Sequence, residues 1–257
     1  MTAKNYSVII FQKEKRVIKM NVAELKNLTK EYKYKIDLHC HTKPASPCSD
    51  ITPERMIELY KETDYDGIVI TNHFIDFILK SDDPETVSQT YLEDYYKTRE
   101  LGEKQGLKVY LGMEIRFPEN CNDYLIYGIK ESDVKKLFSY IHGDYISFYK
   151  DFKSKDNVIV QAHPFRSNMT LQNPDYLDGI ETFNMHPGHN SRIAVATKYA
   201  NEHEGFIKTG GTDFHHEGHQ GLGGIFTKTL PEDSLGLAKI LQSGDYLLNV
   251  AGDIVIP

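Results

Sequence analysis

The sequence predicts an α/β protein, a distorted (β/α)7 TIM-like barrel that forms a single domain over residues 34–257. Apolar, strand-like runs alternate with helical patterns, which is typical of parallel strands joined by crossover helices. The chain has 257 residues, and single α/β barrels commonly contain about 250. Side chains that often bind metals follow several of the strand-like runs, at the end where such barrels build their active sites.

Residues 1–33 precede the predicted barrel as an N-terminal extension, and the sequence assigns no role to them. Within the extension, we expect a strand over residues 6–12 and a short helix over residues 21–32. A contact with the barrel or with another chain would suit this segment equally well.

The predicted barrel strands are short apolar runs, as expected for strands that are buried on both faces. They cover residues 34–39, 66–73, 108–115, 124–129, 157–163, 178–184 and 206–215, and the last of these is expected to be the final strand. Helical patterns lie between most of them, over residues 52–63, 90–106, 132–141 and 190–205.

Capping residues mark the ends of several predicted helices. Thr52 is the expected N-cap of the first barrel helix, and Pro53 suits its first turn. Gly106 is expected to end the second helix, because glycine readily adopts the left-handed conformation of a helix C-terminus. Asn190 is the expected cap of the last helix.

The composition is that of a globular protein with an acidic balance. Hydrophobic residues make up 40% of the chain. The chain has 30 basic and 37 acidic residues, which gives a net charge of -7. This balance disfavours a surface that coats nucleic acid. The apolar run over residues 8–11 is too short for a signal sequence or a membrane span, so we expect a cytoplasmic protein. The oligomeric state stays open.

The stretch "YKIDLHCHT" places two histidines at the end of the first predicted strand. In an extended strand, His39 and His41 point to the same face, and Cys40 points to the other face. Two neutral imidazoles on one face are a ready pair of metal ligands, whereas two solvated histidines at a strand end are the plainer interpretation.

Other metal-binding side chains recur at equivalent points of later strands, and Asp213 and His215 repeat the two-residue spacing. The predicted cluster is His39, His41, His73, Glu114, His163, Asp213 and His215. Seven nitrogen and oxygen donors exceed the needs of one tetrahedral zinc ion, so they predict two to three divalent ions, with Zn, Mn or Fe as candidates. Such a cluster clamps a phosphoryl group and lowers the pKa of a bound water from about 15.7 toward about 7.

The motifs "DLHCHT", "GIVITNHF", "GMEI", "QAHPFR" and "GGTDFH", in this order from about residue 34 to about residue 227, resemble those of the polymerase-and-histidinol-phosphatase (PHP) metallohydrolases. The resemblance implies a distorted barrel of seven β/α units, usually three metals, and hydrolysis of phosphoester bonds. The roles it implies are His39, His41 and Asp213 on the first metal, Glu114 as the bridging carboxylate, His163 on the second metal, and His73 and His215 on the third. It places Asp213, Glu114 and His215 in the catalytic machinery, and Asp213 could also assist as a base.

Two positions depart from the family pattern. The loop "KPASPCSD" follows the first histidine pair, and Asp50 is the expected metal ligand from it, with Cys48 as a weaker substitute. Asp123 stands where the family often has a histidine and is the second expected substitute ligand.

Arg116, Arg166 and His186 are candidates for binding a substrate phosphate. Arg116 lies two residues beyond Glu114, so an extended strand aims both side chains at the same space. A guanidinium can bind phosphate with two parallel hydrogen bonds. A structural ion pair explains Arg116 at least as well, whereas phosphate binding is preferred for Arg166. For His186, a contact at the rim of the site or a hydrogen bond within its loop is expected rather than metal ligation.

The leading hypothesis is a metal-dependent phosphoesterase that hydrolyses a small phosphomonoester through a multinuclear metal cluster and a metal-activated hydroxide. An amidohydrolase-type C–N hydrolase is the first alternative, but many of those enzymes bridge their metals with a modified lysine where this chain has Glu114. A phosphodiesterase or nuclease is the second alternative, and the acidic balance makes nucleic acid an unlikely partner. The third is a metal-binding barrel without catalytic activity, because a fold does not fix a function.

Overall fold

The structure of the chain is a computed structural model that describes residues 6–8, 18–20 and 22–257. In the N-terminal extension, β1 (Tyr6–Val8) pairs with β2 (Ile18–Met20) in an antiparallel ladder, and α1 follows over Val22–Glu31. The predicted helix is confirmed by α1. The predicted strand begins as β1, and its residues 9–12 lie outside the described residues.

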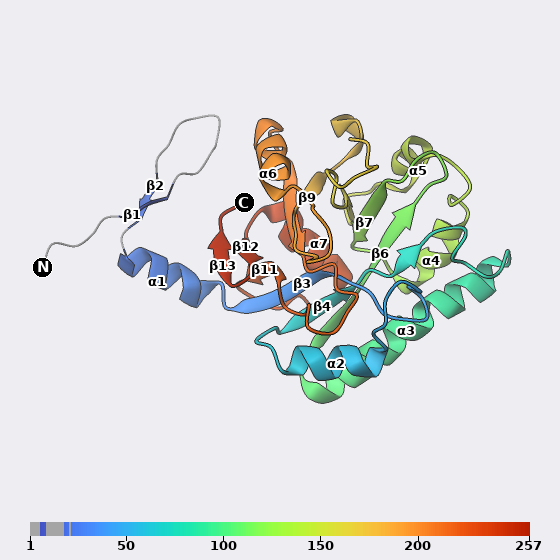
Figure 1. Ribbon diagram of the computed structural model, residues 1–257, viewed down its shortest axis with the longest axis horizontal. Coiled ribbons are helices and arrows are strands. Elements are labelled where there is room, and N and C mark those ends of the chain that lie inside the picture. The colour runs from blue at the N-terminus through green and yellow to red at the C-terminus, as the bar shows by residue number, and fades with distance from the viewer. Residues whose placement is uncertain (1–5, 9–17, 21) are drawn as a thin grey trace, which may run out of the picture.

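One large curled sheet forms the body of the protein, with helices packed on its outside (Figure 1). The order of its strands is β10-β9-β8-β7-β6-β4-β3-β11-β12-β13, and β5 pairs with β6. The strands are β3 (Tyr34–Cys40), β4 (Gly67–Ile70), β5 (His73–Phe74), β6 (Lys108–Arg116), β7 (Asp123–Tyr127), β8 (Val158–Gln161), β9 (Gly179–Asn184), β10 (Ile207–Gly211), β11 (Gly223–Thr227), β12 (Leu247–Val250) and β13 (Asp253–Val255).

Along the chain, the helices alternate with groups of these strands. In space, α2 and α3 run side by side along one side of the sheet (Figure 1). They are α2 (Pro53–Lys61), α3 (Pro84–Gln105), α4 (Glu131–Phe138), α5 (Tyr145–Phe152), α6 (Ile193–Glu202) and α7 (Ser234–Ser243), with a short 3-10 helix, η1, over Pro174–Tyr176. Within the described part of the chain, no helix is both long enough and apolar enough to cross a membrane.

The predicted caps are confirmed for two helices and wrong for one. The Thr52 side chain accepts a hydrogen bond from the Arg55 amide at the start of α2, and Gly106 ends α3 in the left-handed conformation, at a φ of 78°. The last predicted helix begins later than expected, because Arg192 holds the N-cap position of α6. Asn190 instead accepts a hydrogen bond from the Arg192 amide and shapes the preceding loop.

All seven predicted strand regions contain strands, but two features separate the sheet from seven equal β/α units. Strand β7 is antiparallel to β6, because residues 117–122 form a connection too short for a crossover, and it is also antiparallel to β8. The prediction that residues 206–215 hold the final strand was wrong, since β11, β12 and β13 follow as antiparallel strands. The fold is therefore a mixed α/β domain with a curled sheet, and a (β/α)7 TIM barrel is not confirmed.

The curl of the sheet brings the segment after β10 against β3. The Phe214 amide donates to the His39 carbonyl at 3.0 Å, and the His41 amide donates to the Phe214 carbonyl at 3.0 Å. Gly211 permits this approach, because a Cβ atom at that position would lie 2.4 Å from the Cβ atom of His39. The contact places the residues after Gly211 beside the histidine pair at the end of β3.

Candidate metal centre

The two histidines at the end of β3 point into the same buried space. Both His39 and His41 have 0% exposure, and their ring centroids lie 4.9 Å apart. Cys40 faces the other way, as its position in the strand predicts, and its sulfur lies 3.4 Å from the Tyr60 hydroxyl in the apolar core.

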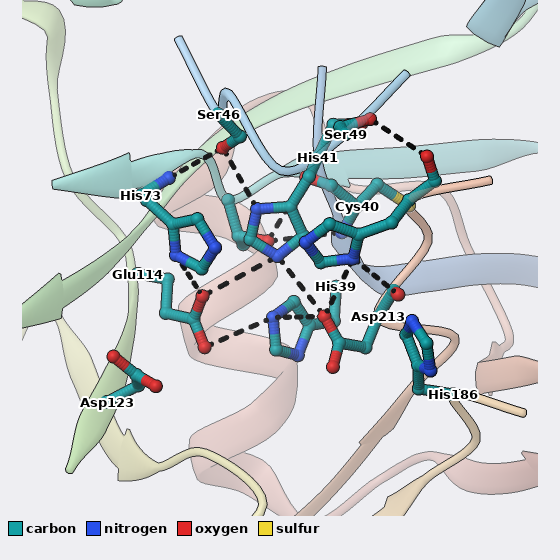
Figure 2. A network of polar contacts seen from close by, with 12 residues as sticks. His39, Cys40, His41, Ser46, Ser49, His73, Glu114, Asp123, His186 and Asp213 are labelled. Atoms are coloured by element: carbon teal, nitrogen blue, oxygen red, sulfur yellow. Dashed lines mark hydrogen bonds and ion pairs between the residues drawn. The ribbon is translucent and has the colours of Figure 1, made fainter. Parts of the chain in front are cut away.

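Glu114 on β6 is the centre of the cluster. Figure 2 shows His39, His41 and His73 around its carboxylate, and His163 is the fourth imidazole beside it. Its Oε1 atom lies 3.1 Å from His163 Nε2 and 3.4 Å from His39 Nε2. Its Oε2 atom lies 2.7 Å from His73 Nδ1 and 3.6 Å from His41 Nε2. Pairing of β5 with β6 sets His73 directly opposite Glu114 and fixes this approach.

Asp213 and His215 enter from the segment after β10. Asp213 Oδ1 lies 3.4 Å from the Nε2 atoms of both His39 and His41. The His215 ring stacks on His41 with a centroid distance of 4.2 Å. The close contact between this segment and β3 therefore brings ligands from opposite ends of the domain sequence into one site.

These side chains form three groups, and within each group the candidate ligand atoms lie within 4.8 Å of one another; two of the groups share His41. The structure thus brings together the seven residues of the predicted cluster and Asp123, one of the two expected substitute ligands. The groups are His39, His41 and Asp213; Glu114, Asp123 and His163; and His41, His73 and His215.

Asp50 requires a correction to the predicted ligand set. Its side chain is 63% exposed, and its Oδ2 atom lies 3.3 Å from His216 Nδ1, outside the three groups. The turn that precedes it directs Asp50 outward and leaves Cys48 beside the cluster, in contact with His73 and His215. Although burial opposes it, contact with these two imidazoles lowers the pKa of the Cys48 thiol to about 6.

Asp123 on β7 faces the cluster, with a side chain that is 3% exposed. Its Oδ2 atom lies 3.8 Å from His163 Nε2. Arg116 binds the same carboxylate with two hydrogen bonds of 2.7 Å each. Burial and the nearby Glu114 raise the pKa of Asp123, and Arg116 partly offsets them. The ion pair expected as the alternative role of Arg116 is therefore present.

The unpaired atoms of the cluster fit divalent metal ions. Within the described residues, five buried ligand atoms lack a hydrogen-bond partner: His39 Nε2, His41 Nε2, His73 Nδ1, His163 Nδ1 and Glu114 Oε2. An unsatisfied buried polar group costs about 1–3 kcal/mol, so such groups rarely gather without a function. A donor set of imidazoles and carboxylates suits Zn, Mn or Fe, and metal ligation would satisfy these atoms.

Hydrogen bonds on the far side of the imidazoles orient them toward the centre. His39 Nδ1 lies 2.9 Å from Glu181 Oε1, and His41 Nδ1 lies 3.1 Å from Ser46 Oγ. His215 Nδ1 lies 2.9 Å from the Asp213 carbonyl oxygen. Since a carbonyl or carboxylate partner takes the Nδ1 proton, Nε2 of His39 and of His215 is left for a metal.

Glu181 was missed by the analysis of the sequence, although it lies in the predicted strand over residues 178–184. It is buried, and it also accepts hydrogen bonds from the His163 amide at 3.0 Å and from Asn184 at 2.9 Å. A carboxylate in the middle of a short strand, between Ile180 and Phe183, was the signal that could have identified it.

Glu181→Gln is expected to weaken metal binding by about 10- to 100-fold, which is typical when the partner of a ligating histidine is lost. The variant keeps the shape of the side chain but removes the charge that holds His39 in place. Competition with a chelator measures the affinity, and Glu202→Gln on the exposed surface of α6 is the matched control. Equal affinity in the two variants would show that Glu181 has no positioning role.

The cluster holds strongly perturbed charges. Burial lowers the pKa of His39, but the carboxylates of Asp213, Glu181 and Glu114 outweigh it and raise the pKa well above its usual value. For His73, Glu114 likewise overcomes burial and raises the pKa to about 10. The neighbouring imidazoles in turn hold the pKa values of Glu114 and Asp213 well below their usual range, against the effect of burial.

His41 differs from its neighbours. Burial, together with the charges of His215 and His73, lowers its pKa well below the usual value. A neutral imidazole at this position offers Nε2 directly to a metal, without first losing a proton.

Two of the candidate ligands have strained backbones. His163 and Asp213 have φ values of 30° and 55°, in the left-handed region that non-glycine residues seldom occupy. Such strain gathers at functional sites, where the surrounding contacts hold it in place. The hydrogen bond from the His163 amide to Glu181 is one of these contacts.

A pocket of about 520 Å³ opens beside the cluster, and the three predicted phosphate-binding residues line it. Arg166 donates to Asn184 Oδ1 at 2.6 Å and also binds Asp213. His186 is buried beside Asp213, and its Nδ1 atom accepts the Gly188 amide at 3.0 Å. Burial lowers the pKa of His186 to about 4, so this imidazole is neutral near pH 7.

Two solved structures share this fold. A two-domain protein from Bacteroides vulgatus ATCC 8482, which contains a predicted PHP-like metal-dependent phosphoesterase, matches with a TM-score of 0.63 and 17% identity over 86% of this chain and 66% of its own. This chain therefore spans about two thirds of that protein. PsfC from Pseudomonas syringae PB-5123 matches with a TM-score of 0.52 and 17% identity over 75% of this chain and 80% of its own.

No curated protein matches the chain in sequence. The model of the PHP domain, however, matches residues 37–219, which contain every member of the three ligand groups. The chain belongs to the PHP domain family.

Proposed function

We propose that this protein is a metal-dependent phosphoesterase that hydrolyses a small phosphomonoester. The observation that carries the proposal is the position of the three ligand groups beside a pocket that also presents the guanidinium groups of Arg116 and Arg166. A phosphomonoester carries more negative charge than a diester, and it suits a site that combines divalent cations with two arginines.

Two to three divalent ions would occupy the site, held by the three ligand groups, and the Glu114 carboxylate lies close to imidazoles of all three groups. When bound, these ions would neutralise phosphate oxygens and lower the pKa of a coordinated water to give a nucleophile near neutral pH. Asp213 would act as a ligand rather than as a proton acceptor, because its low pKa keeps it ionised and weakly basic.

The residues of the pocket would orient the substrate. Arg166 uses Nε and one terminal nitrogen for its contacts with Ser191, Asn184 and Asp213, which hold the guanidinium in place beside the pocket. Since the Gly188 amide occupies Nδ1 of the neutral His186, the proton lies on Nε2. His186 would therefore donate a hydrogen bond to a phosphate or leaving-group oxygen, and would not contribute a positive charge.

The sheet itself is proposed to be a distorted barrel, closed where the segment after β10 meets β3. The parallel bridge between Cys40 and Phe214 supports this closure. It would place the ligand groups at one mouth of the barrel, where α/β barrels carry their active sites.

Elemental analysis and a hydrolysis assay on the same preparation test the function. Two to three metals per chain, with turnover of p-nitrophenyl phosphate that a chelator abolishes and Mn or Zn restores, are expected. Faster turnover of bis-p-nitrophenyl phosphate would instead indicate a diesterase. Bound metal without turnover of either ester would contradict the proposal and favour an amidohydrolase or a metal-binding barrel without activity.

A further inference from the structure

We propose that Cys48 is a thiolate ligand for a metal held by His73 and His215, at the position where the sequence favoured Asp50. The inference rests on the metal-binding part of the proposed function, but not on the reaction. It makes one of the three ligand groups a mixed site of sulfur and nitrogen, unlike the other two, which contain only imidazole and carboxylate donors.

The position of the thiol is the first support. Cys48, His73 and His215 all line the same pocket beside the cluster. The group of His41, His73 and His215 also contains unsatisfied buried atoms, His41 Nε2 and His73 Nδ1. His41 has 0% exposure, so its free nitrogen points to a ligand that belongs in this space.

Hydrogen bonds connect the loop around Cys48 to the histidines of this group. Ser46 Oγ lies 3.1 Å from His41 Nδ1 and accepts the His73 amide at 2.9 Å. Ser49 Oγ donates to the carbonyl oxygens of His41 and His215, both at 3.1 Å. The serines on either side of Cys48 are thus bonded to the same three histidines, which fixes residue 48 beside them before any metal binds.

Asp50 is excluded by its position. Its amide donates to the His215 carbonyl at 3.2 Å, so its backbone is anchored close to the site. Its carboxylate nevertheless lies on the outer side, 63% exposed and beside His216. A rotation that brought this carboxylate inward would compete with Cys48 for the same two imidazoles.

The donor chemistry gives the proposal a consequence for metal choice. Binding would convert the Cys48 thiol and a free divalent ion into a metal–sulfur bond, with the thiol proton released to solvent and no change in oxidation state. Thiolate and imidazole donors favour Zn²⁺ or Co²⁺, whereas Mn²⁺ and Mg²⁺ prefer oxygen ligands. The site with Cys48 is therefore expected to prefer zinc or cobalt.

Cobalt substitution tests the proposal, because a thiolate bound to Co²⁺ gives a charge-transfer absorption band in the near ultraviolet. The full-length protein is loaded with Co²⁺ and compared with Cys48→Ser, Asp50→Asn and Cys121→Ser. The band is expected in the wild-type protein and in the last two variants, and its loss is expected in Cys48→Ser alone. Cys121 is a matched control, since it is also an exposed free cysteine.

Alkylation by iodoacetamide gives a second measurement that does not depend on activity. Zn²⁺ is expected to protect Cys48 but not Cys121, and a chelator is expected to restore the reaction of Cys48.

A band that persists in Cys48→Ser, or cobalt that binds to the wild-type protein without a band, would overturn the proposal. Protein that binds no metal under any loading would overturn both this proposal and the metal centre. A metal-loaded protein with the band but without phosphatase turnover would leave the thiolate ligand established and refute only the proposed reaction.

Discussion

Replacing Glu114 with alanine is expected to lower phosphoesterase turnover by about 1000-fold or more, a loss of ~4 kcal/mol of transition-state stabilisation. The same change should reduce the number of bound metals. Its carboxylate lies within 3.6 Å of four imidazoles that come from all three ligand groups, so its loss disturbs every group. Turnover of p-nitrophenyl phosphate and elemental analysis of the same samples measure both effects, and His39→Ala is expected to follow Glu114→Ala.

His203→Ala is the control for this prediction. His203 follows α6, and its Nδ1 atom lies 2.8 Å from the Tyr199 carbonyl, away from the three ligand groups. Its replacement is expected to leave turnover and metal content close to those of the wild-type protein. Circular dichroism checks that each variant is folded. Equal turnover in Glu114→Ala and His203→Ala would refute the assignment of the site.

The cluster could be predicted because several of its residues lie at the ends of apolar, strand-like runs. His39, Glu114 and His163 each follow or end an apolar run, and parallel strands deliver such residues to the same edge of a sheet. Strand periodicity also predicted that His41 would join His39 and that Cys40 would turn away. These inferences needed only the local pattern, because the direction of a side chain on a strand alternates with residue number.

Loop residues could not be placed in the same way. Asp50 and Cys48 lie two residues apart in one turn. The hydrogen bonds of Ser46 and Ser49 with His41 and His215 hold this turn, in which the Asp50 side chain is directed outward. Those bonds join residues that are separated by as many as 166 positions in the sequence. Periodicity carries no information about contacts of this kind, and Asp50 was preferred because the family usually has a histidine or an aspartate in this loop.

The antiparallel strands of the sheet could not be predicted either, because the apolar pattern of a strand does not reveal the direction of its neighbours. The strand-like run over residues 124–129 has the same composition whether it pairs in parallel or antiparallel fashion. The direction of β7 relative to β6 depends on the connection over residues 117–122, which is too short for a crossover. Strands β12 and β13 are short, and β13 is partly exposed, so their apolar patterns are weak.

Metal loading is expected to raise the melting temperature of the metal-free protein by about 5–10 °C for each site, and by more at pH 8 than at pH 6. A ligand at 100 times its dissociation constant stabilises a folded protein by about 2.7 kcal/mol. For a domain of this size, each kcal/mol corresponds to roughly 2–4 °C. Thermal unfolding with and without Zn²⁺, at pH 6, 7 and 8, measures the increase.

The direction of the pH effect follows from protons and metals sharing the same nitrogen atoms. The pKa of His73 is raised to about 10 in the folded protein, and that of His39 is raised well above its usual value. A raised pKa contributes stability that is fully present below the unfolded value of about 6.5 and is lost as the pH rises toward the folded value. The metal-free protein should therefore become less stable between pH 6.5 and 10.

Metal affinity changes in the opposite direction over the same window. A metal must displace the protons of His39 and His73, and this displacement costs less as the pH rises. Glu114 and Asp213 stay ionised throughout, because their pKa values are already lowered, so they add no pH dependence between pH 6 and 8. The gap between the loaded and the metal-free protein must then widen with pH, and the release of protons on metal binding should be detectable with an indicator dye. A gap that narrows from pH 6 to pH 8 would mean that His39 and His73 are not where the metals bind.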